Sequence, residues 1–133
     1  MSTKAAPQAV TAPRAPAPVG PYAHAVAAGG TLYLSGQIGL DPDTGRIPGA
    51  TAAEQARQAL RNLRAVLESQ DLTLRALAKV TVFLTDMGQF AAVNDVYAEE
   101  MAGWTPARSV VQVSALPKGA LVEIEGIAFC RRT

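Results

Sequence analysis

The stretch Lys79–Ser114 reads KVTVFLTDMGQFAAVNDVYAEEMAGWTPARSVVQVS. Polar and apolar residues alternate over Lys79–Thr85, which is typical of a strand. Apolar residues then recur at helical spacing over 86–101, and the helix is expected to end before Pro106, which cannot continue it. A β-branched run over 108–114 predicts a second strand. A strand, a helix and a further strand in this order favour a crossover connection within one sheet.

Upstream of this stretch, the sequence predicts a hairpin followed by another helix. The runs Tyr22–Ala28 and Thr31–Ile38 flank a Gly-Gly pair, which suits a tight turn between antiparallel strands. Thr51 and Glu54 have the spacing of a capping box, in which each side chain accepts a hydrogen bond from a backbone N–H at the helix start. The helix that they begin has an apolar stripe formed by Ala56, Leu60, Leu63 and Leu67.

The order of these elements defines the expected fold class. A last β-rich run from Leu121 to Cys130 predicts the final strand of the chain. Because each predicted helix lies between two strands, both helices are expected to cross over the same face of a mixed sheet. The expected fold is therefore an α+β sandwich, in which two helices cover one face of the sheet.

The N-terminal segment differs in composition from the rest of the chain. Residues 1–19 are rich in Ala and Pro, so they offer little apolar surface for a core, and we expect them to be flexible. The folded part is expected to be one domain over 20–133, a length that can bury a core of its own. Pro and Gln interrupt the segment throughout, so it lacks the continuous apolar run of a signal peptide.

The composition argues against nucleic-acid and membrane partners. Lys and Arg number 12 against 11 Asp and Glu, so the net charge of +1 provides no basic footprint for a phosphate backbone. Arg57, Arg61 and Arg64 recur at helical spacing and are expected to form a solvent-exposed face. No apolar stretch is long enough to span a bilayer. Charged residues make up 17% of the chain, below the usual fraction of about a quarter, so copies of the chain are expected to bury apolar surface against one another.

Cysteine and histidine occur once each, as Cys130 and His24. No internal disulfide can form, and this usage favours a cytoplasmic protein. One His and one Cys cannot build a transition-metal site without several carboxylates. A nucleophilic triad would have to be built around His24 alone. We therefore expect chemistry that uses no metal, no other cofactor and no triad.

Arg108 is the leading candidate for ligand binding, because it opens a strand directly after the turn at Pro106. A guanidinium in such a place needs an acidic partner or water, and its fixed N–H donors suit a small carboxylate. That carboxylate could belong to a ligand. It could equally belong to Glu123 or Glu125, which share one side of the last strand. The pattern leaves both interpretations open, a ligand clamp and a structural ion pair.

Several short runs occur in a characteristic order along the chain. They are Gly20-Pro21-Tyr22, Leu34-Ser35-Gly36-Gln37, Lys79–Leu84, Val93-Asn94, Pro106–Ser109 and Val122–Glu125. Taken together they resemble the RidA (YjgF) family of reactive-intermediate deaminases. The resemblance implies a chorismate-mutase-like α+β fold and a homotrimer with ligand sites between subunits. It also implies the cofactor-free hydrolysis of enamines and imines, such as 2-aminoacrylate and 2-imino acids, to 2-keto acids and ammonia.

The resemblance assigns roles to individual residues. Arg108 matches the arginine that binds the substrate carboxylate. Glu123 matches the acid that handles water or protons at the imine carbon, and Glu125 is the alternative from the sequence alone. Further positions that line the same substrate cleft match Tyr22, Ser35, Gly36 and Asn94. Structural roles are open for some of these as well, since Asn94 could brace a helix and Tyr22 could be an ordinary strand aromatic.

Two positions depart from the family pattern. The archetype has a cysteine two residues after the arginine and an acid two further on, where this chain has Val110 and Gln112. Thiol chemistry at that point is excluded, whereas imine hydrolysis needs no covalent nucleophile. The departures favour one rival interpretation, a non-catalytic protein that binds small carboxylates. A second rival, RNA binding or cleavage, is opposed by the near-neutral charge and the single histidine.

Overall fold

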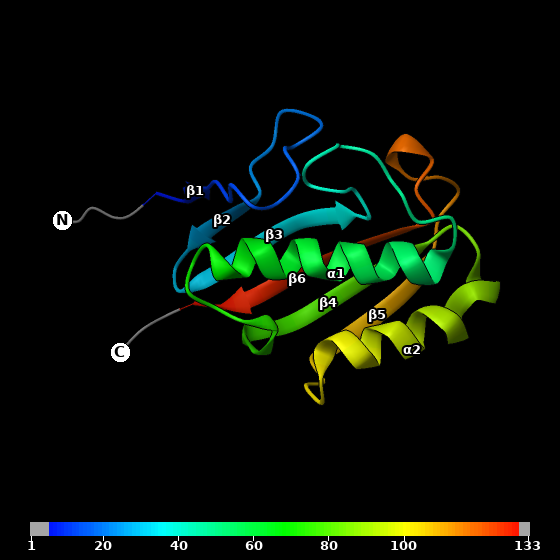
Figure 1. Ribbon diagram of the computed structural model, residues 1–133. Coiled ribbons are helices and arrows are strands. Elements are labelled where there is room, and N and C mark those ends of the chain that lie inside the picture. The colour runs from blue at the N-terminus through cyan, green and yellow to red at the C-terminus, as the bar shows by residue number, and fades with distance from the viewer. Residues whose placement is uncertain (1–5, 131–133) are drawn as a thin grey trace.

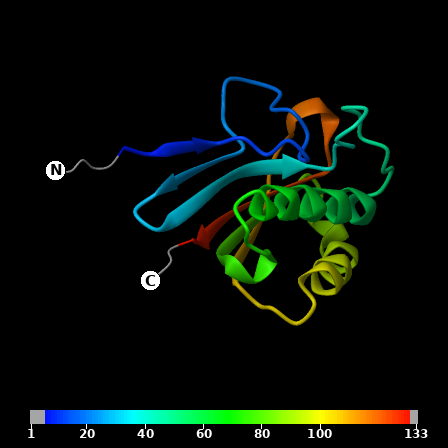
Figure 2. The ribbon, with the colours of Figure 1, turned by 60° about the vertical axis from the view of Figure 1, so that its left-hand side comes forward.

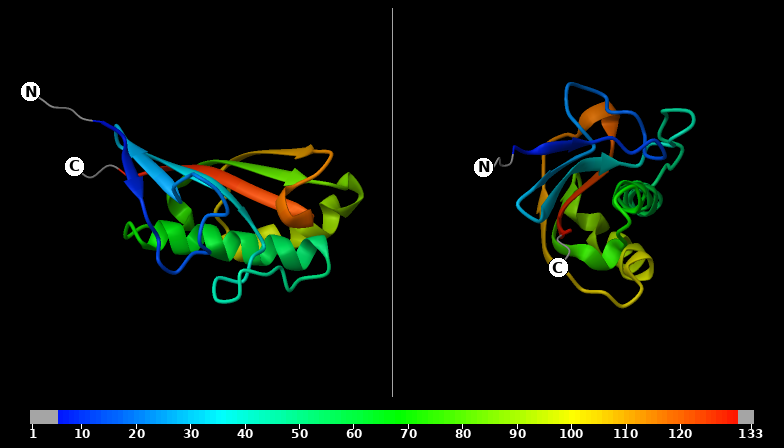
Figure 3. Two further views of the ribbon diagram at one scale, coloured as in Figure 1. Left: turned by 90° about the horizontal axis from the view of Figure 1, so that it is seen from above. Right: turned by 90° about the vertical axis from the view of Figure 1, so that its left-hand side faces the viewer.

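The computed structural model describes residues 6–130, so positions 1–5 of the predicted flexible segment lie outside the described residues. The strands are β1 Gln8–Val10, β2 Ala25–Ala28, β3 Thr31–Ile38, β4 Leu77–Leu84, β5 Ala107–Gln112 and β6 Val122–Phe129, and the α-helices are α1 Ala52–Glu68 and α2 Phe90–Met101. The strands form one sheet in the order β1-β2-β3-β6-β4-β5. Both helices cover the same face of this sheet (Figures 1 and 3), which confirms the predicted fold class. Within residues 6–130, no helix is long and apolar enough to cross a membrane.

The predicted hairpin consists of β2 and β3, which pair in antiparallel register. Gly29 and Gly30 connect them with φ values of 58° and 82°, a left-handed conformation that glycine adopts without steric cost. β2 begins at Ala25, three residues later than predicted. The reason is a turn at this point of the chain, where the N–H of Tyr22 donates to the carbonyl of Gly20 at 2.9 Å.

The start of α1 forms the predicted capping box. The Thr51 hydroxyl accepts from the Glu54 N–H at 3.1 Å, and the Glu54 carboxylate accepts from the Thr51 N–H at 3.1 Å. The hydrogen bond from the Thr51 backbone is the main reason why the pKa of Glu54 is lowered. The predicted apolar stripe of α1 is 0% exposed at each of its positions Ala56, Leu60, Leu63 and Leu67. This stripe fixes α1 on the sheet.

The chain from β4 to β5 forms the predicted crossover. Asp86 accepts from the Gly88 N–H at 2.8 Å and begins a short 3-10 turn, which leads into α2. The helix ends at Met101, and the residue that caps it, Ala102, takes a left-handed conformation with a φ of 48°. The chain then returns as β5, which pairs parallel to β4 at the edge of the sheet. Figure 2 shows α2 beside α1 on the helix-covered face.

The last strand, β6, lies in the interior of the sheet. It pairs antiparallel with β3 on one side and with β4 on the other, so β5 and β6 are not neighbours. The last two strands therefore form no hairpin in which Arg108 and the Glu residues could share a face. Val122 and Ile124 of β6 are both 0% exposed.

The N-terminal segment contributes to the core, contrary to the prediction. β1 pairs with β2, and Val10, Ala12 and Ala15 belong to the main hydrophobic core with exposures of 6%, 0% and 5%. Small side chains are sufficient here, because the loop lies close to the start of β2 and is hydrogen-bonded to His24. The predicted domain boundary at residue 20 is therefore wrong for the described part of the segment, since the domain includes β1.

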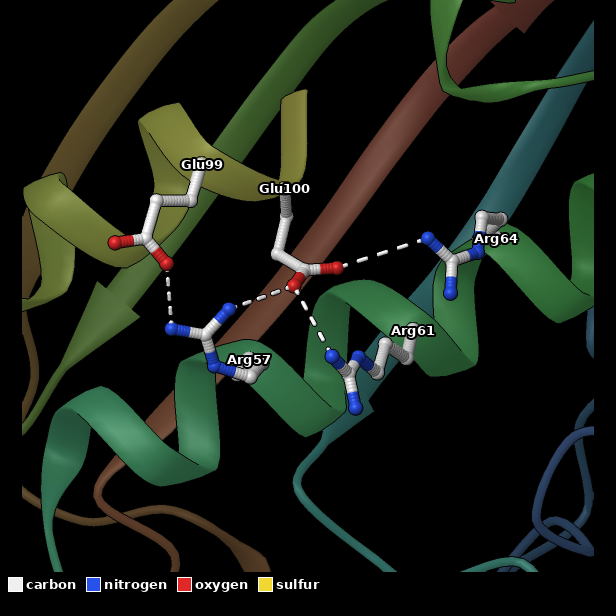
Figure 4. A network of polar contacts seen from close by, with 5 residues as sticks. All are labelled: Arg57, Arg61, Arg64, Glu99 and Glu100. Carbon is white, nitrogen blue, oxygen red and sulfur yellow. Dashed lines mark hydrogen bonds and ion pairs between the residues drawn. The ribbon is translucent and has the colours of Figure 1, made fainter. Parts of the chain in front are cut away.

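The arginine row of α1 contacts α2 rather than water alone (Figure 4). Arg57 donates to Glu99 at 2.7 Å and to Glu100 at 2.8 Å. Arg61 and Arg64 approach the same Glu100 carboxylate at 3.5 and 3.7 Å. The arginine side chains remain 35–50% exposed, as expected for a solvent-exposed face, whereas Glu100 is only 7% exposed. The row is thus an ion-pair network that joins the two helices.

Candidate functional site

One cleft, about 280 Å³ in volume, contains the candidate acid. We call it the Glu123 cleft. It lies between the segment that precedes β2, the second half of β3 and the start of β6. Most of the predicted site residues line it, namely Tyr22, Ser35, Gly36 and Glu123. The segment Pro16–Val19 and the side chains of Ile38 and Leu40 complete its wall, so most of that wall is apolar.

Glu123 lies on the sheet face opposite the helices, because it pairs with Phe83 of β4 while its two neighbours in β6 are buried. Burial raises the pKa of the Glu123 carboxyl group, and the negative charge of Glu125 raises it further. The carboxylate rests against Gly36, where any side chain would overlap Glu123 Oε2. Glu125 is exposed and does not line the cleft. Of the two acids that the sequence left open, Glu123 is the one in a cleft.

The hydroxyl groups of Ser35 and Tyr22 are both engaged with nearby backbone. Ser35 Oγ donates to the carbonyl of Ala23 at 2.6 Å. The Tyr22 hydroxyl accepts from the Val19 N–H at 3.2 Å, which leaves its own proton available to the cleft. Both side chains therefore have a structural role in holding the segment before β2. These bonds also fix the direction in which each oxygen faces the cleft.

A second cleft, about 380 Å³ in volume, contains the candidate arginine. We call it the Arg108 cleft. It lies between α2 and the start of β5, and both Arg108 and Asn94 line it. Its wall is largely apolar and includes Tyr97, Met101 and Trp104. The structure therefore divides the predicted site residues between two separate clefts of one chain.

Arg108 is held by neutral groups. Its Nη1 atom donates to Asn94 Oδ1 at 2.8 Å. Its guanidinium carbon lies 4.6 Å from the ring centre of Tyr97 and 5.8 Å from that of Phe90, at cation–π distances. Among residues 6–130, no carboxylate forms an ion pair with it. The interpretation of Arg108 as one half of a structural ion pair is therefore wrong for the described residues.

Arg108 and Glu123 point to opposite faces of the sheet. Arg108 pairs with Val80 in the parallel register of β4 and β5, and Val80 is 0% exposed beneath the helices. Glu123 pairs with Phe83 of the same strand β4, on the uncovered face. Because successive side chains of a strand alternate between faces, the two candidates cannot meet within one chain.

The sequence did not identify Tyr97 as part of the site. Its ring lies under the guanidinium of Arg108, and its hydroxyl group is buried without a hydrogen-bond partner among the described residues. Burial raises the pKa of Tyr97, and the nearby charge of Arg108 partly opposes this. A signal was present, since Asn94 and Tyr97 are three residues apart and so lie on one side of a helix. It could not be used without knowing that this side of α2 faces β5.

The two positions that depart from the family pattern have ordinary structural roles. Val110 follows Arg108 on the helix-covered side of β5 and packs against the core. Gln112 accepts a hydrogen bond from the Met87 N–H at 2.7 Å, which connects the end of β5 to the start of the 3-10 turn. Neither side chain contributes a charge or a nucleophile to the Arg108 cleft.

The two clefts contain complementary chemistry. An arginine that lacks an acidic partner can bind a small carboxylate through two parallel hydrogen bonds. A half-buried carboxyl group with a raised pKa can exchange a proton with water or with a nitrogen atom. No nucleophile is aligned with a base in either cleft of the described chain, because Ser35 donates to backbone and the single histidine is bonded to backbone.

Known proteins resemble the chain over most of its length. The mouse protein named 2-iminobutanoate/2-iminopropanoate deaminase is 44% identical over 119 residues, which cover 90% of this chain and 88% of that protein. The solved structure of the Rid-family protein YyfA from Yersinia pestis is 46% identical with a TM-score of 0.89 and covers 93% of this chain and 99% of that one. E. coli TdcF, solved with bound serine, is 40% identical with a TM-score of 0.86 and covers 95% and 99%.

A family profile also matches most of the chain. The profile described as endoribonuclease L-PSP matches residues 12–130, which include both clefts and nearly the whole described chain. The match begins within the N-terminal segment, in agreement with the part that this segment plays in the core. The chain therefore belongs to the endoribonuclease L-PSP family, which is the RidA (YjgF) family that the sequence motifs resemble.

Proposed function

We propose that the protein hydrolyses reactive enamines and imines, such as 2-aminoacrylate and 2-imino acids, to 2-keto acids and ammonia. The single observation that carries this proposal is the environment of Arg108. Its charge is held by Asn94 and two aromatic rings and has no acidic partner among the described residues, so it suits a substrate carboxylate. The deaminase name of the mouse relative supports the same activity.

The proposed reaction requires only water and proton transfer. Arg108 binds the carboxylate and so directs the C=N carbon towards a water molecule beside Glu123. Glu123 accepts a proton from this water molecule as the water oxygen bonds to carbon, and the imine nitrogen takes a proton from solvent, which gives a carbinolamine. Glu123 then returns its proton to the nitrogen atom. The C–N bond breaks, ammonia leaves, and the hydroxyl group releases its proton to solvent as its oxygen becomes the keto oxygen.

The site is proposed to form between subunits of a homotrimer. Arg108 and Glu123 point to opposite faces of one sheet, so one substrate can reach both only if they come from different copies. The uncovered sheet face supports such an assembly, because Tyr33, Ile127 and Phe129 are 50%, 39% and 60% exposed on it. Apolar side chains gathered on one face are typical of an interface between chains.

An assay with a competing trap tests the proposed activity. An amino-acid oxidase generates 2-imino acids, semicarbazide competes for them, and hydrolysis lowers the yield of the trapped imine. We expect the protein to lower this yield and Arg108→Ala to reduce kcat/KM by at least about 100-fold, since two charge-assisted hydrogen bonds of about 1.5–3 kcal/mol each are lost. Arg61→Ala is the matched control, because Arg61 is half exposed and lies outside both clefts. Full activity of Arg108→Ala contradicts the clamp.

Mixing two inactive variants tests the shared site. Arg108→Ala and Glu123→Gln are unfolded together and refolded, so that subunits of both kinds enter one assembly. If each site takes Arg108 from one copy and Glu123 from another, some sites in the mixture contain both intact residues and activity returns. If both residues serve a site within one chain, the mixture stays as inactive as its components.

The rival functions have distinct outcomes in the same experiments. A non-catalytic protein that binds small carboxylates, which Val110 and Gln112 favour, gives Arg108-dependent binding of a 2-keto acid but no change in trapping. The family description names an endoribonuclease. The net charge of +1 and the engagement of both His24 ring nitrogens with backbone argue against RNA cleavage by this chain.

A further inference from the structure

His24 is a buried residue that the proposed reaction does not use. It is 4% exposed and precedes β2. Its Nδ1 atom accepts from the Ala12 N–H at 2.9 Å, and its Nε2 atom lies 2.8 Å from the carbonyl oxygen of Pro16. One imidazole ring thus joins both ends of the loop 12–16 to the start of β2.

These two contacts determine the protonation state of the ring. The Ala12 N–H can only donate, so Nδ1 must have a free lone pair. The Pro16 carbonyl can only accept, so Nε2 must carry the hydrogen atom. The ring is therefore neutral with its proton on Nε2. A second proton on Nδ1 would place two N–H groups against each other, and the hydrogen bond to Ala12 would be lost.

The loop that His24 holds leads directly into the wall of the Glu123 cleft. Pro16 is at once an acceptor for His24 and the first residue of the wall segment Pro16–Val19. At its other end, the Val19 N–H donates to the Tyr22 hydroxyl. The carbonyl of His24 itself accepts from the Ser35 N–H at 3.0 Å. His24 therefore connects the loop, the cleft wall and β3.

We propose that neutral His24 is a positioning residue that holds the Pro16–Val19 wall of the Glu123 cleft through these two hydrogen bonds. The effect on catalysis rests on the proposed deaminase function, whereas the effect on the loop does not.

Two variants test the hydrogen bonds of His24. In His24→Gln, the amide oxygen can accept from the Ala12 N–H and the amide nitrogen can donate to the Pro16 carbonyl. In His24→Leu, both hydrogen bonds are lost and an apolar side chain fills the space. Arg14→Gln is the control for activity, because it removes a charge from the same loop and leaves both bonds intact.

The first readouts need no enzyme activity. Because His24 is the single histidine of the chain, a ¹⁵N-detected imidazole spectrum of the wild-type protein reports its tautomer without assignment. Trypsin cleavage after Arg14 reports release of the loop, because Arg14 lies between the two bonded residues Ala12 and Pro16. We expect the Nε2–H tautomer at pH 8, and cleavage about 10-fold faster or more in His24→Leu, since two hydrogen bonds no longer oppose local opening.

The amide variant separates the hydrogen bonds from mere filling of the space. At pH 8 we expect His24→Gln to be cleaved as slowly as the wild type. In the imine assay, we expect KM to rise about 10-fold in His24→Leu, with a smaller change in kcat, because the wall is lost while Glu123 and Arg108 remain. The KM values of His24→Gln and Arg14→Gln should stay close to that of the wild type.

Several results would overturn the proposal. These are an Nδ1–H tautomer at pH 8, equal cleavage of His24→Leu and wild type at pH 8, or cleavage of His24→Gln as fast as that of His24→Leu. Failure of the proposed function gives a different pattern, with no imine hydrolysis by the wild type while the tautomer and cleavage results still hold. If the His24→Leu chain does not fold, the wild-type tautomer and the cleavage rate of His24→Gln relative to the wild type decide.

Discussion

The side-chain carbonyl of Asn94 accepts a hydrogen bond from Arg108 at 2.8 Å, between the middle of α2 and the second residue of β5. A neutral amide orients the guanidinium without cancelling its charge. The ring of Tyr97 supports the same group from below at 4.6 Å. Arg108 is thus fixed in position before any ligand arrives, which lowers the entropic cost of binding one.

Asn94→Asp should weaken substrate binding more than Asn94→Ala does. The new carboxylate would form an ion pair with Arg108 and compete with the substrate carboxylate, so we expect KM to rise by about 10-fold or more, from a bond of about 1.5–3 kcal/mol. Urea unfolding serves as the control, because the added ion pair should leave the free energy of unfolding unchanged or higher. A KM for Asn94→Asp equal to that of the wild type would mean that Arg108 does not bind the substrate.

Glu123→Gln should strongly lower kcat/KM and should remove the acid limb from the pH profile of the activity that remains. Acting first as a base, Glu123 must be ionised, and burial raises its pKa. Activity should therefore fall with decreasing pH at a pH above the ordinary range of a glutamate. Glu125→Gln is the matched control and should lower that pH slightly, because it removes the second charge that raises the pKa. An unchanged profile for both variants would exclude Glu123 as the titrating group.

The same substitution should have the opposite effect on stability. Because the pKa of Glu123 is higher in the folded state, the unfolded chain loses this proton first as the pH rises, and the folded protein loses stability between the two pKa values. Glu123→Gln removes this loss. Thermal unfolding should therefore show the variant gaining stability relative to the wild type as the pH rises above the ordinary pKa of a glutamate.

Gly36→Ala should displace the Glu123 carboxylate, because the added Cβ atom would overlap its Oε2 atom. We expect kcat to fall on the order of 100-fold, since small displacements of a reacting group have effects of that size. Gly20→Ala is the control, because its Cβ atom would meet the Tyr22 ring at an ordinary 3.5 Å. Steady-state kinetics give the kcat of each variant. Equal kcat values for the two would show that the contact with Gly36 does not position Glu123.

Glu100→Gln should destabilise the packing of the helices without affecting the site. Its carboxylate is 7% exposed and faces three arginines, so its loss leaves their charges without a shared partner (Figure 4). We expect the free energy of unfolding in urea to fall by about 1–3 kcal/mol. Arg61→Gln removes one exposed member at 3.5 Å and should cost at most about 1 kcal/mol. Equal losses for both variants would mean that Glu100 is not the centre of the network.

Ile127→Lys should disrupt the proposed assembly. Ile127 lies directly opposite Tyr33 on the uncovered sheet face, so a lysine would place a charge in the apolar interface. We expect a smaller particle by sedimentation and the loss of imine hydrolysis in parallel. Ala92→Lys adds the same charge on the exposed side of α2 and should leave both unchanged. A wild-type protein that sediments as a monomer would exclude the trimer.

Local signals in the sequence predicted most elements correctly. The capping box at Thr51 and the glycine turn of the first hairpin depend on neighbouring residues alone. Two placements depended on distant partners. β6 lies in the interior of the sheet between β3 and β4, and its own residues do not indicate which strands pair with it. β1 was missed because the Ala- and Pro-rich segment offers little apolar surface. The contact of this segment with the core depends on how the loop after β1 folds.

The candidate site was predictable only in parts. The family motifs identified Arg108, Glu123 and the other residues predicted to line the site. The alternation of side chains along a single strand could not establish which side of that strand faces the helices. Tyr97 was missed for the same reason, since its contact with Arg108 depends on how α2 lies against β5. The role of the wall segment Pro16–Val19 depended on His24, which has no recognisable signal of its own.

The placement of Arg108 and Glu123 on opposite faces of one sheet has a consequence for how activity varies with the amount of protein. If the site is shared between copies as proposed, a dissociated chain is expected to be catalytically silent. The rate per chain should then fall on dilution below the dissociation constant of the assembly, and it should recover on concentration. Cells that express little of the protein would have disproportionately little of its activity.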